Sequence, residues 1–412
     1  MIQGLCGLIV FIGVAWLFSE NKKAFPVRTI AGGLILQFAI ALTILKVPVF
    51  KDFFLSLNTL VYALEDATRA GTSFVFGFLG GGPLPFEEPY PGAAWVFGFR
   101  ALPLILVMSA LSALLYYWRI IPMLVQGFAF VVQKVMGISG ALGLSVAANI
   151  FVGMLEAPLI IRPYLNKLSR SELFTLMNCG MATIAGTMLV LYAGILKTAI
   201  PESLGHILIA SVISVPASIL IAQVMVPESE KQDTTLVHPP QTAESSMDAI
   251  SRGTTEGISL IMNVAATLIV FVALVALVNS ILGLLPAING TPVTLQYILG
   301  HIMSPVAWLC GISWEESHIA GQLLGTKVIL NEFIAYLDLA KLPAEALTER
   351  SRIIITYAMC GFANLGSLGI LVGGLGAMMP ERRKEILSFG GRSIIGGVLS
   401  TCMTGAIVGI LY

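Results

Sequence analysis

The chain has 412 residues, of which 57% are hydrophobic and 11% charged, and its mean hydropathy is +0.90. Soluble domains carry about 25% charged residues and need a polar surface. This composition therefore excludes a soluble enzyme, a disordered chain and a secreted disulfide scaffold. Lys+Arg and Asp+Glu each number 23, so the chain offers no net basic surface to nucleic acid. The sequence predicts an all-α polytopic membrane protein.

Eight apolar segments are long enough to cross a bilayer, which takes about 20 residues. They are residues 2–19, 29–45, 101–118, 174–195, 207–226, 257–285, 353–375 and 393–412. We interpret the first as a transmembrane helix and not as a cleavable signal peptide, because it lacks a preceding basic residue and a small-residue cleavage motif.

Two further apolar segments, 136–161 and 300–339, are interrupted by glycine and proline. Each carries an asparagine and a glutamate: Asn149 and Glu156 in the first, Asn331 and Glu332 in the second. Such segments favour re-entrant hairpins, whose non-helical tips survive only against protein or a wet cavity. A pair of them in corresponding halves indicates a transporter site near the bilayer midplane.

The two halves share an order of elements. Each hairpin precedes a span with polar residues beside glycine, at 182–186 and at 363–367, and then one more span. We expect an inverted repeat in which these two spans are broken helices with free carbonyls. The predicted divisions are scaffold and trimerisation helices in 1–135, a first transport repeat in 136–226, a cytoplasmic loop in 227–256, a scaffold helix in 257–285 and a second transport repeat in 300–412.

Orientation follows from the basic residues of the short loops. Three loops are rich in Lys and Arg, around Lys22, Arg170 and Arg383. All three are cytoplasmic if both termini lie outside and both hairpins enter and leave on the same side. Residues 47–91 and 120–134 are expected to form interfacial helices.

Two glutamates are the leading candidates for function. A carboxylate at membrane depth costs about 2.5–3.5 kcal/mol, so Glu156 is expected to bind substrate or couple to an ion. The alternative interpretation of Glu156 is a structural carboxyl whose hydrogen bonds come from helix N-termini or a neighbouring hydroxyl. Glu332, beside Asn331, suits a vicinal pair of hydroxyls because an ionised carboxylate only accepts. Its alternative is a structural pair with Lys327.

Other polar residues could complete the site. Asn364 and Ser367 lie three apart and could bind a polyhydroxyl substrate, or else join helices by hydrogen bonds. Phe362 could stack on a flat ligand or simply pack in the core.

A small cation could use hard oxygens from the first repeat. Asn149 and Thr183 would supply side-chain oxygens, and Val152 and Ile184 would supply carbonyls. Zinc-type spacing and the usual nucleophile motifs are absent from the sequence, so we expect no enzymatic activity and no cofactor.

Three blocks together resemble one family, the concentrative nucleoside transporters. They are GMLEAPL at 153–159, NEFIAYLDL at 331–339 and GFANLGSLGI at 361–370. The resemblance implies a homotrimer whose protomers have about eight transmembrane helices and two opposed re-entrant hairpins. It also implies a nucleoside:cation symporter of the bacterial inner membrane.

The resemblance assigns roles residue by residue. Ribose would be held by Glu332, Asn364 and Ser367, with Asn331 beside them. Phe362 would lie against the base, and Glu156 would help to bind the base side. Sodium would be bound at the positions of Asn149, Val152, Thr183 and Ile184.

One departure from the family pattern concerns the base. Most relatives have Gln and then Ser or Thr where this chain has Met154 and Leu155, and Met188 adds a further apolar wall. Losing hydrogen-bond partners costs about 1–3 kcal/mol per buried group. We therefore expect looser or purine-leaning selection, or a non-nucleoside ribosyl compound.

Two alternatives stay open. A proton carried by Glu156 or Glu332 could replace sodium, because burial raises a carboxyl pKa. The chain could also be a channel or a transporter of another polar solute. An intramembrane enzyme or structural subunit is disfavoured, because no nucleophile–base pair is visible.

Overall fold

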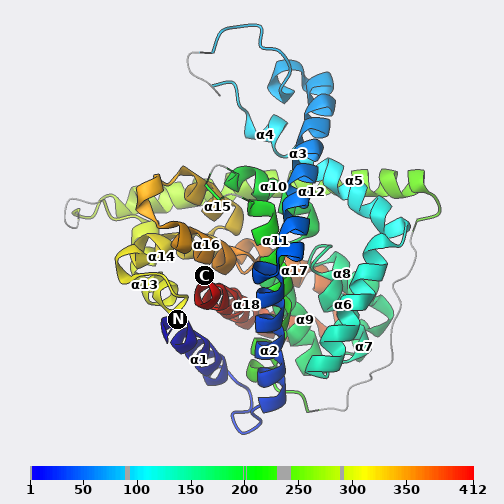
Figure 1. Cartoon of the computed structure of the whole chain (residues 1–412), viewed down its shortest axis with the longest axis vertical. Coiled ribbons are helices and arrows are strands. Elements are labelled where there is room, and N and C mark those ends of the chain that lie inside the picture. The colour runs from blue at the N-terminus through cyan, green and yellow to red at the C-terminus, as the bar shows by residue number, and fades with distance from the viewer. Residues whose placement is uncertain (1, 89–92, 198, 201, 230–242, 288–291) are drawn as a thin grey trace.

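The computed structural model describes residues 2–88, 93–197, 199–200, 202–229, 243–287 and 292–412 (Figure 1). Every regular element in these ranges is a helix. At the centre lie α11 (Ser203–Met225) and α18 (Arg383–Leu411), which pack against each other and against α9 (Arg170–Ala182). Most residues of all three helices are buried. They form the core on which the other helices assemble.

All eight predicted spans are helical. Among the described residues, six segments are long and apolar enough to cross a membrane, namely Val27–Lys46, Phe97–Tyr117, Arg170–Leu196, Ser203–Met225, Ser246–Leu282 and Pro380–Leu411. A seventh predicted span is α1 (Ile2–Leu17), of 16 residues. The eighth is divided into α16 (Glu349–Met359) and α17 (Leu365–Met378). The chain is thus an all-helical polytopic membrane protein.

The order of helices occurs twice. The first set is α5 (Pro103–Tyr117), α6 (Ile120–Met136), α7 (Gly140–Ala148), α8 (Glu156–Ile160), α9, α10 (Gly186–Leu196) and α11. The second set is α12 (Ser246–Leu282), α13 (Leu295–Leu309), α14 (Trp314–Ile329), α15 (Glu332–Lys341), α16, α17 and α18. Each set contains a divided helix where the sequence predicted one, between α9 and α10 and between α16 and α17.

The same turn chemistry begins both hairpins. Gly137 follows α6 with φ +68° and Gly311 follows α13 with φ +103°, a backbone conformation that favours glycine. Ser139 and Ser313 then cap α7 and α14, each accepting a backbone N–H with its side chain. The local sequence therefore sets a sharp turn and a new helix at equivalent places.

Two predicted boundaries differ from the helix ends in the structure. The predicted second hairpin, 300–339, includes the end of α13, which meets α14 at a bend of 117°. The glycine turn and serine cap described above place the start of the hairpin at Trp314.

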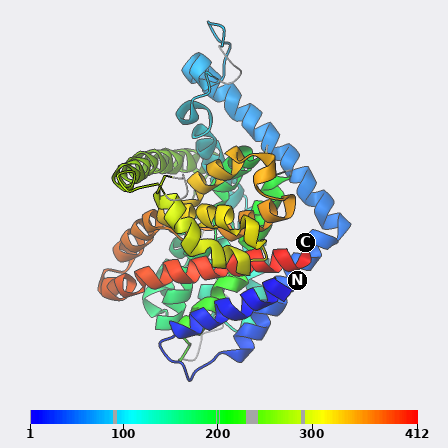
Figure 2. The same cartoon turned by 90° about the vertical axis from the view of Figure 1, so that its left-hand side faces the viewer.

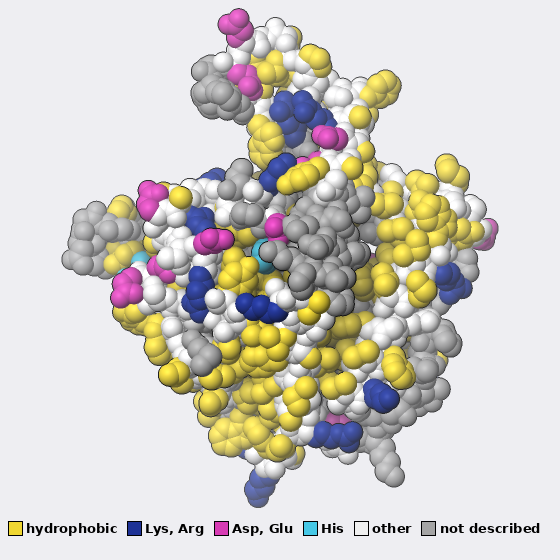
Figure 3. Space-filling model, in the orientation of Figure 1, with side chains coloured by type: hydrophobic (Ala, Val, Ile, Leu, Met, Phe, Trp, Pro, Cys, Tyr) yellow, Lys and Arg dark blue, Asp and Glu magenta, His cyan; other side chains and the backbone are white. Residues whose placement is uncertain are grey.

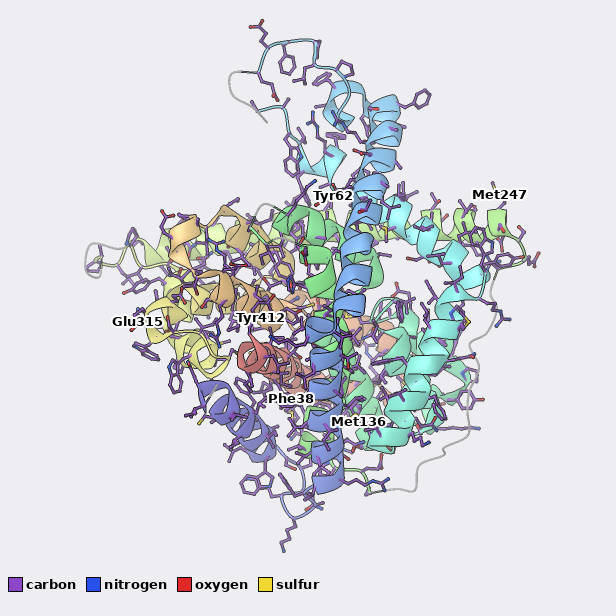
Figure 4. All side chains as sticks on the ribbon, in the orientation of Figure 1. Phe38, Tyr62, Met136, Met247, Glu315 and Tyr412 are labelled. Carbon is purple, nitrogen blue, oxygen red and sulfur yellow. The ribbon has the colours of Figure 1, made fainter. Side chains whose placement is uncertain are left out.

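The predicted loop 227–256 is also too long. The Ser245 side chain accepts from the N–H of Asp248, so α12 begins at Ser246. Exposed Met247 marks this end of the helix (Figure 4).

The segment 47–91 contains the expected helix, α3 (Pro48–Phe76), which is 29 residues long. With η1 (Gly77–Gly80) and α4 (Phe97–Arg100), its end projects from the body, and Figure 2 shows it along one edge of the molecule. Arg69 donates to the Gly81 carbonyl at 3.0 Å and Arg100 to the Phe78 carbonyl at 3.1 Å. These bonds fold the chain back at the tip.

The three basic loops meet at one end of the molecule. Arg170 pairs with Glu20 at 2.7 Å and with Glu385 at 3.3 Å, and Arg392 also pairs with Glu20. Hydrogen bonding to the Arg170 guanidinium lowers the pKa of Glu20. The N- and C-termini lie side by side, at the other ends of α1 and α18 from these loops (Figure 2). Figure 3 shows a broad apolar surface with basic side chains below it and mixed charges above.

Helices α5 and α12 cross closely through small residues. Gly253 and Gly257, four apart on α12, lie against α5 around Ser109. A Cβ added at Gly253 would be 2.7 Å from the Ser109 carbonyl oxygen and 2.8 Å from the Ala110 Cα. Small residues spaced in this way allow membrane helices to approach backbone to backbone.

We expect Gly253→Ala to destabilise the protein by about 1–3 kcal/mol, because the backbone of α5 cannot yield to the new methyl group. The melting temperature of purified protein in detergent measures this effect. Gly127→Ala in α6 is the control, since nothing lies within 4 Å of its added Cβ. Alanine favours a helix over glycine by about 1 kcal/mol, so the control should be neutral or stabilising. Equal melting temperatures for the two variants would contradict the close crossing.

Candidate substrate and cation site

Four interruptions of the helices come together inside the protein. The gap between α9 and α10 lies against the gap between α16 and α17, because the N–H of Phe362 donates to the Thr183 carbonyl at 3.2 Å. Gly361 allows this approach, since a Cβ there would be 2.9 Å from the Ala182 carbonyl oxygen. The two hairpin tips reach the same region through the contacts described next.

A buried carboxylate lies at the tip of the second hairpin. Glu332 is the first residue of α15, and its side chain is 4% exposed. One carboxylate oxygen accepts from the Tyr192 hydroxyl at 2.5 Å, and the other accepts from the Asn364 amide at 3.0 Å. Tyr192 and Asn364 are themselves 0% and 1% exposed. Glu332 and Asn364, two predicted site residues, are therefore in direct contact.

Two helix N-termini converge on this carboxylate. Asn331 caps α15 by accepting from the N–H of Ile334 at 2.9 Å, and Asn364 caps α17 by accepting from the N–H of Ser367 at 2.7 Å. Asn364 lies just outside α17 as its N-cap, since the helix begins only at Leu365. The N-terminal ends of two helices carry partial positive charge, which stabilises an anion between them.

Lys327 does not form the direct ion pair that was the structural alternative for Glu332. Its side chain is fully buried on α14, and its amine donates to the Thr401 hydroxyl at 3.0 Å. Within the described residues, its nitrogen lies more than 4.0 Å from the Glu332 carboxylate. The direct partners of the carboxylate are a hydroxyl and an amide.

The first hairpin contributes a cluster of oxygens. The Asn149 amide donates to the Thr183 hydroxyl at 2.5 Å and to the Cys179 carbonyl at 3.1 Å, and the Thr183 hydroxyl donates to the same carbonyl at 2.9 Å. Among the described residues, no hydrogen bond reaches the Asn149 side-chain oxygen or the carbonyls of Val152 and Ile184. All four residues predicted to bind a cation lie at the hairpin tip or the adjoining break, and three of their oxygens lack a donor.

The tip of the first hairpin packs against neighbouring helices. Met154 is 8% exposed and lies against Gly180 of α9. Leu155 lies against Gly374 of α17, so close that a Cβ at that glycine would be 2.3 Å from it. Gly374 and Ser367 are seven residues apart and share a face of α17. Leu155 thus lies along the same face of α17 as Ser367, one of the predicted ribose residues.

Glu156 lies apart from the Glu332 cluster. Its side chain is exposed in the single chain and folds back over Gly153, where a Cβ would be 2.1 Å from the carboxylate. Glu332, by contrast, is buried, so the two predicted carboxylates differ in exposure in the single chain. The glycine makes room for the carboxylate at the start of α8.

Tyr192 was missed by sequence reasoning. It lies in the predicted span 174–195 among Leu, Val and Ala, where an aromatic residue is usually core. The available signal was its hydroxyl, because a buried Tyr O–H needs an acceptor. Met188 precedes it by one helical turn on α10 and is 4% exposed. An apolar side chain from the predicted base pocket therefore borders the carboxylate cluster.

A polar cavity of about 620 Å³ lies between α3 and the second halves of α10 and α15. Its lining includes Glu65, Lys197 and Leu337, and Lys197 lies 3.9 Å from Glu65. Glu332 does not line this cavity, although Leu337 follows it on α15. This cavity is therefore distinct from the carboxylate cluster, although both involve helix α15.

Comparisons with known proteins agree with this architecture. Three family models match the chain. The model of the Na+ dependent nucleoside transporter N-terminus matches residues 6–79, and that of the C-terminus matches residues 206–409. A model described as nucleoside recognition matches residues 98–199 between them. The chain is 37% identical to an uncharacterized transporter of Haemophilus influenzae, covering 100% of this chain and 97% of the relative. It is 35% identical to the nucleoside permease NupC of Helicobacter pylori, covering 98% and 96%.

Solved structures show the same fold. CNTnw in an inward-facing substrate-bound state is 38% identical, with a TM-score of 0.90 over 99% of this chain and 98% of that chain. A carboxylate and amide cluster at the junction of broken membrane helices is the arrangement of a secondary transporter. The chain belongs to the concentrative nucleoside transporter family. It is a multi-pass membrane transporter and not an enzyme.

Proposed function

We propose that this protein imports nucleosides by symport with a cation, and that Glu332 and Asn364 hold the ribose together with Ser367. The observation that carries the proposal is the buried Glu332 carboxylate, with one oxygen bonded to Tyr192 and the other to Asn364. An ionised carboxylate offers about four acceptor positions. Two of these acceptor positions stay available, which matches the two vicinal hydroxyls of a ribose.

The proposed cation is sodium, bound between the first hairpin and the first broken helix. Oxygens of Asn149, Val152 and Ile184 that lack donors support this assignment, with the Thr183 hydroxyl beside them. In transporters, backbone carbonyls that are freed where a helix unwinds commonly coordinate the coupling ion. Ion binding would order the hairpin tip, and linkage requires that the nucleoside in turn tighten ion binding.

The proposed arrangement in the membrane uses the basic loops as a guide. Glu20, Arg170 and Arg392 lie at the end assigned to the cytoplasm, so both termini would be periplasmic in a bacterial inner membrane. The face of α12 that is turned away from α5 exposes apolar side chains such as Met262 and Ile269. That face suits contacts within the proposed homotrimer or with lipid.

The apolar side chains near the site predict the choice of base. Met154, Leu155 and Met188 offer no strong hydrogen-bonding groups to a pyrimidine edge. We expect adenosine and inosine to compete with labelled adenosine at least as well as uridine and cytidine. The double variant Met154→Gln, Leu155→Thr should shift the preference toward uridine, by roughly 10-fold for each 1.4 kcal/mol of hydrogen bonding gained. A strong preference of the unmodified protein for uridine or cytidine would contradict the apolar pocket.

Uptake by proteoliposomes tests the transport mechanism itself. Labelled adenosine is offered with an inward sodium gradient, with choline in its place, and with an inward proton gradient at constant sodium. Accumulation above equilibrium that needs sodium supports the proposal. Accumulation that needs only the proton gradient would show that the proton, and not sodium, is the coupling ion. Equilibration without accumulation would indicate a channel or facilitator.

A further inference from the structure

We propose that Tyr192 is a positioning residue that fixes the plane of the Glu332 carboxylate for the ribose hydroxyls. This inference rests on the proposed ribose-binding role of Glu332. Tyr192 belongs to α10 of the first helix set, whereas Glu332 and Asn364 belong to the second. The Tyr192 hydroxyl therefore connects the two halves of the protein at the proposed substrate site.

The end of a glutamate side chain turns freely unless neighbouring groups hold it. The terminal torsion of Glu is broad, so one hydrogen bond leaves the carboxylate plane free to turn. Asn364 holds only one oxygen, at 3.0 Å. The Tyr192 hydroxyl holds the other at 2.5 Å, and a carboxylate can only accept this bond. Two donors on different oxygens define the plane, and with it the direction of the two remaining acceptor positions.

Packing holds the tyrosine ring in place. Its centroid lies 5.2 Å from that of Tyr336 and 6.2 Å from that of Phe333, both on α15. Tyr192 is 0% exposed, so its hydroxyl has no water to turn to. The ring cluster thus presents the O–H group rigidly, which lowers the cost of ordering the site when substrate binds.

The structure supplies a matched control in Tyr336. Its hydroxyl donates to the Thr356 carbonyl at 3.1 Å, and it too is 0% exposed. Changing either tyrosine to phenylalanine removes one buried, hydrogen-bonded hydroxyl from the same aromatic cluster. Only Tyr192→Phe removes a bond to Glu332. A general loss of packing or stability would affect both variants alike.

Calorimetric binding to the purified full-length protein tests the inference. Adenosine and 2′,3′-dideoxyadenosine are titrated into the unmodified protein, Tyr192→Phe and Tyr336→Phe, and melting temperatures are recorded for all three. We expect Tyr192→Phe to raise the Kd of adenosine about 10-fold, the effect of losing one charged hydrogen bond. The Kd of the dideoxy analogue should change less than twofold. Tyr336→Phe should leave both Kd values unchanged.

The outcomes separate this inference from the proposed function. If the unmodified protein prefers adenosine to its dideoxy analogue, but Tyr192→Phe keeps the same preference, the inference is overturned and the ribose role of Glu332 stands. An equal effect of Tyr336→Phe on adenosine would also overturn it. If the unmodified protein binds both ligands equally, the ribose role itself is wrong and the inference fails with it.

Discussion

Replacing Glu332 with glutamine is expected to lower nucleoside uptake about 100-fold, because two hydrogen bonds to a charged group are each worth about 1.5–3 kcal/mol. Both protein neighbours of the carboxylate, Tyr192 and Asn364, can donate to it. A carboxamide has only one oxygen, so one of these donors would face an NH₂ group. The ribose hydroxyls would lose an acceptor and the negative charge at the same time.

The measurement is initial uptake of labelled adenosine by proteoliposomes that contain equal amounts of protein. Asp338→Asn is the matched control, because Asp338 is half-buried on the same helix, α15, and among the described residues it has no hydrogen bond to Asn364 or Tyr192. The control should retain uptake within about threefold, a change below 1 kcal/mol. Uptake by Glu332→Gln at the level of this control would refute the ribose role of Glu332.

The large-scale fold could be predicted because bilayer length and glycine pattern are local signals. The eight spans follow from the number of consecutive apolar residues. The two helix breaks follow from polar residues beside glycine, and they were found between α9 and α10 and between α16 and α17. The meeting of Asn149 with Thr183 was anticipated by pairing oxygens of the first hairpin and the first break, whereas that of Glu332 with Asn364 was implied by the family resemblance.

Other features depend on tertiary contacts and local caps that composition does not show. Tyr192 looks like a core aromatic until its hydroxyl is seen 2.5 Å from Glu332. The start of α12 depends on one serine cap in a polar stretch that otherwise resembles a loop. The second hairpin begins later than predicted because Gly311 ends α13 with a positive φ. A glycine in an apolar segment marks a break, but the sequence alone does not say which break forms the turn.

Thr183→Val is expected to raise the sodium concentration for half-maximal uptake at least about 10-fold, the lower end of what a supporting interaction is worth at a metal site. Valine is close to threonine in volume, so the main loss is the hydroxyl. That hydroxyl accepts from the Asn149 amide at 2.5 Å and donates to the Cys179 carbonyl at 2.9 Å. Without it, the proposed site loses one oxygen ligand, and the Asn149 side chain loses the bond that orients its free oxygen.

Thr175→Val separates this effect from a general disturbance of α9. The Thr175 hydroxyl also donates to a carbonyl four residues earlier, that of Ser171 at 2.8 Å, and it is equally buried. Both variants therefore lose the same type of bond on the same helix, but only Thr183 adjoins Asn149. Sodium activation curves at fixed pH should move for Thr183→Val and not for Thr175→Val. Equal curves for the two variants would place the coupling ion elsewhere, because the hydroxyl would then contribute only to helix stability.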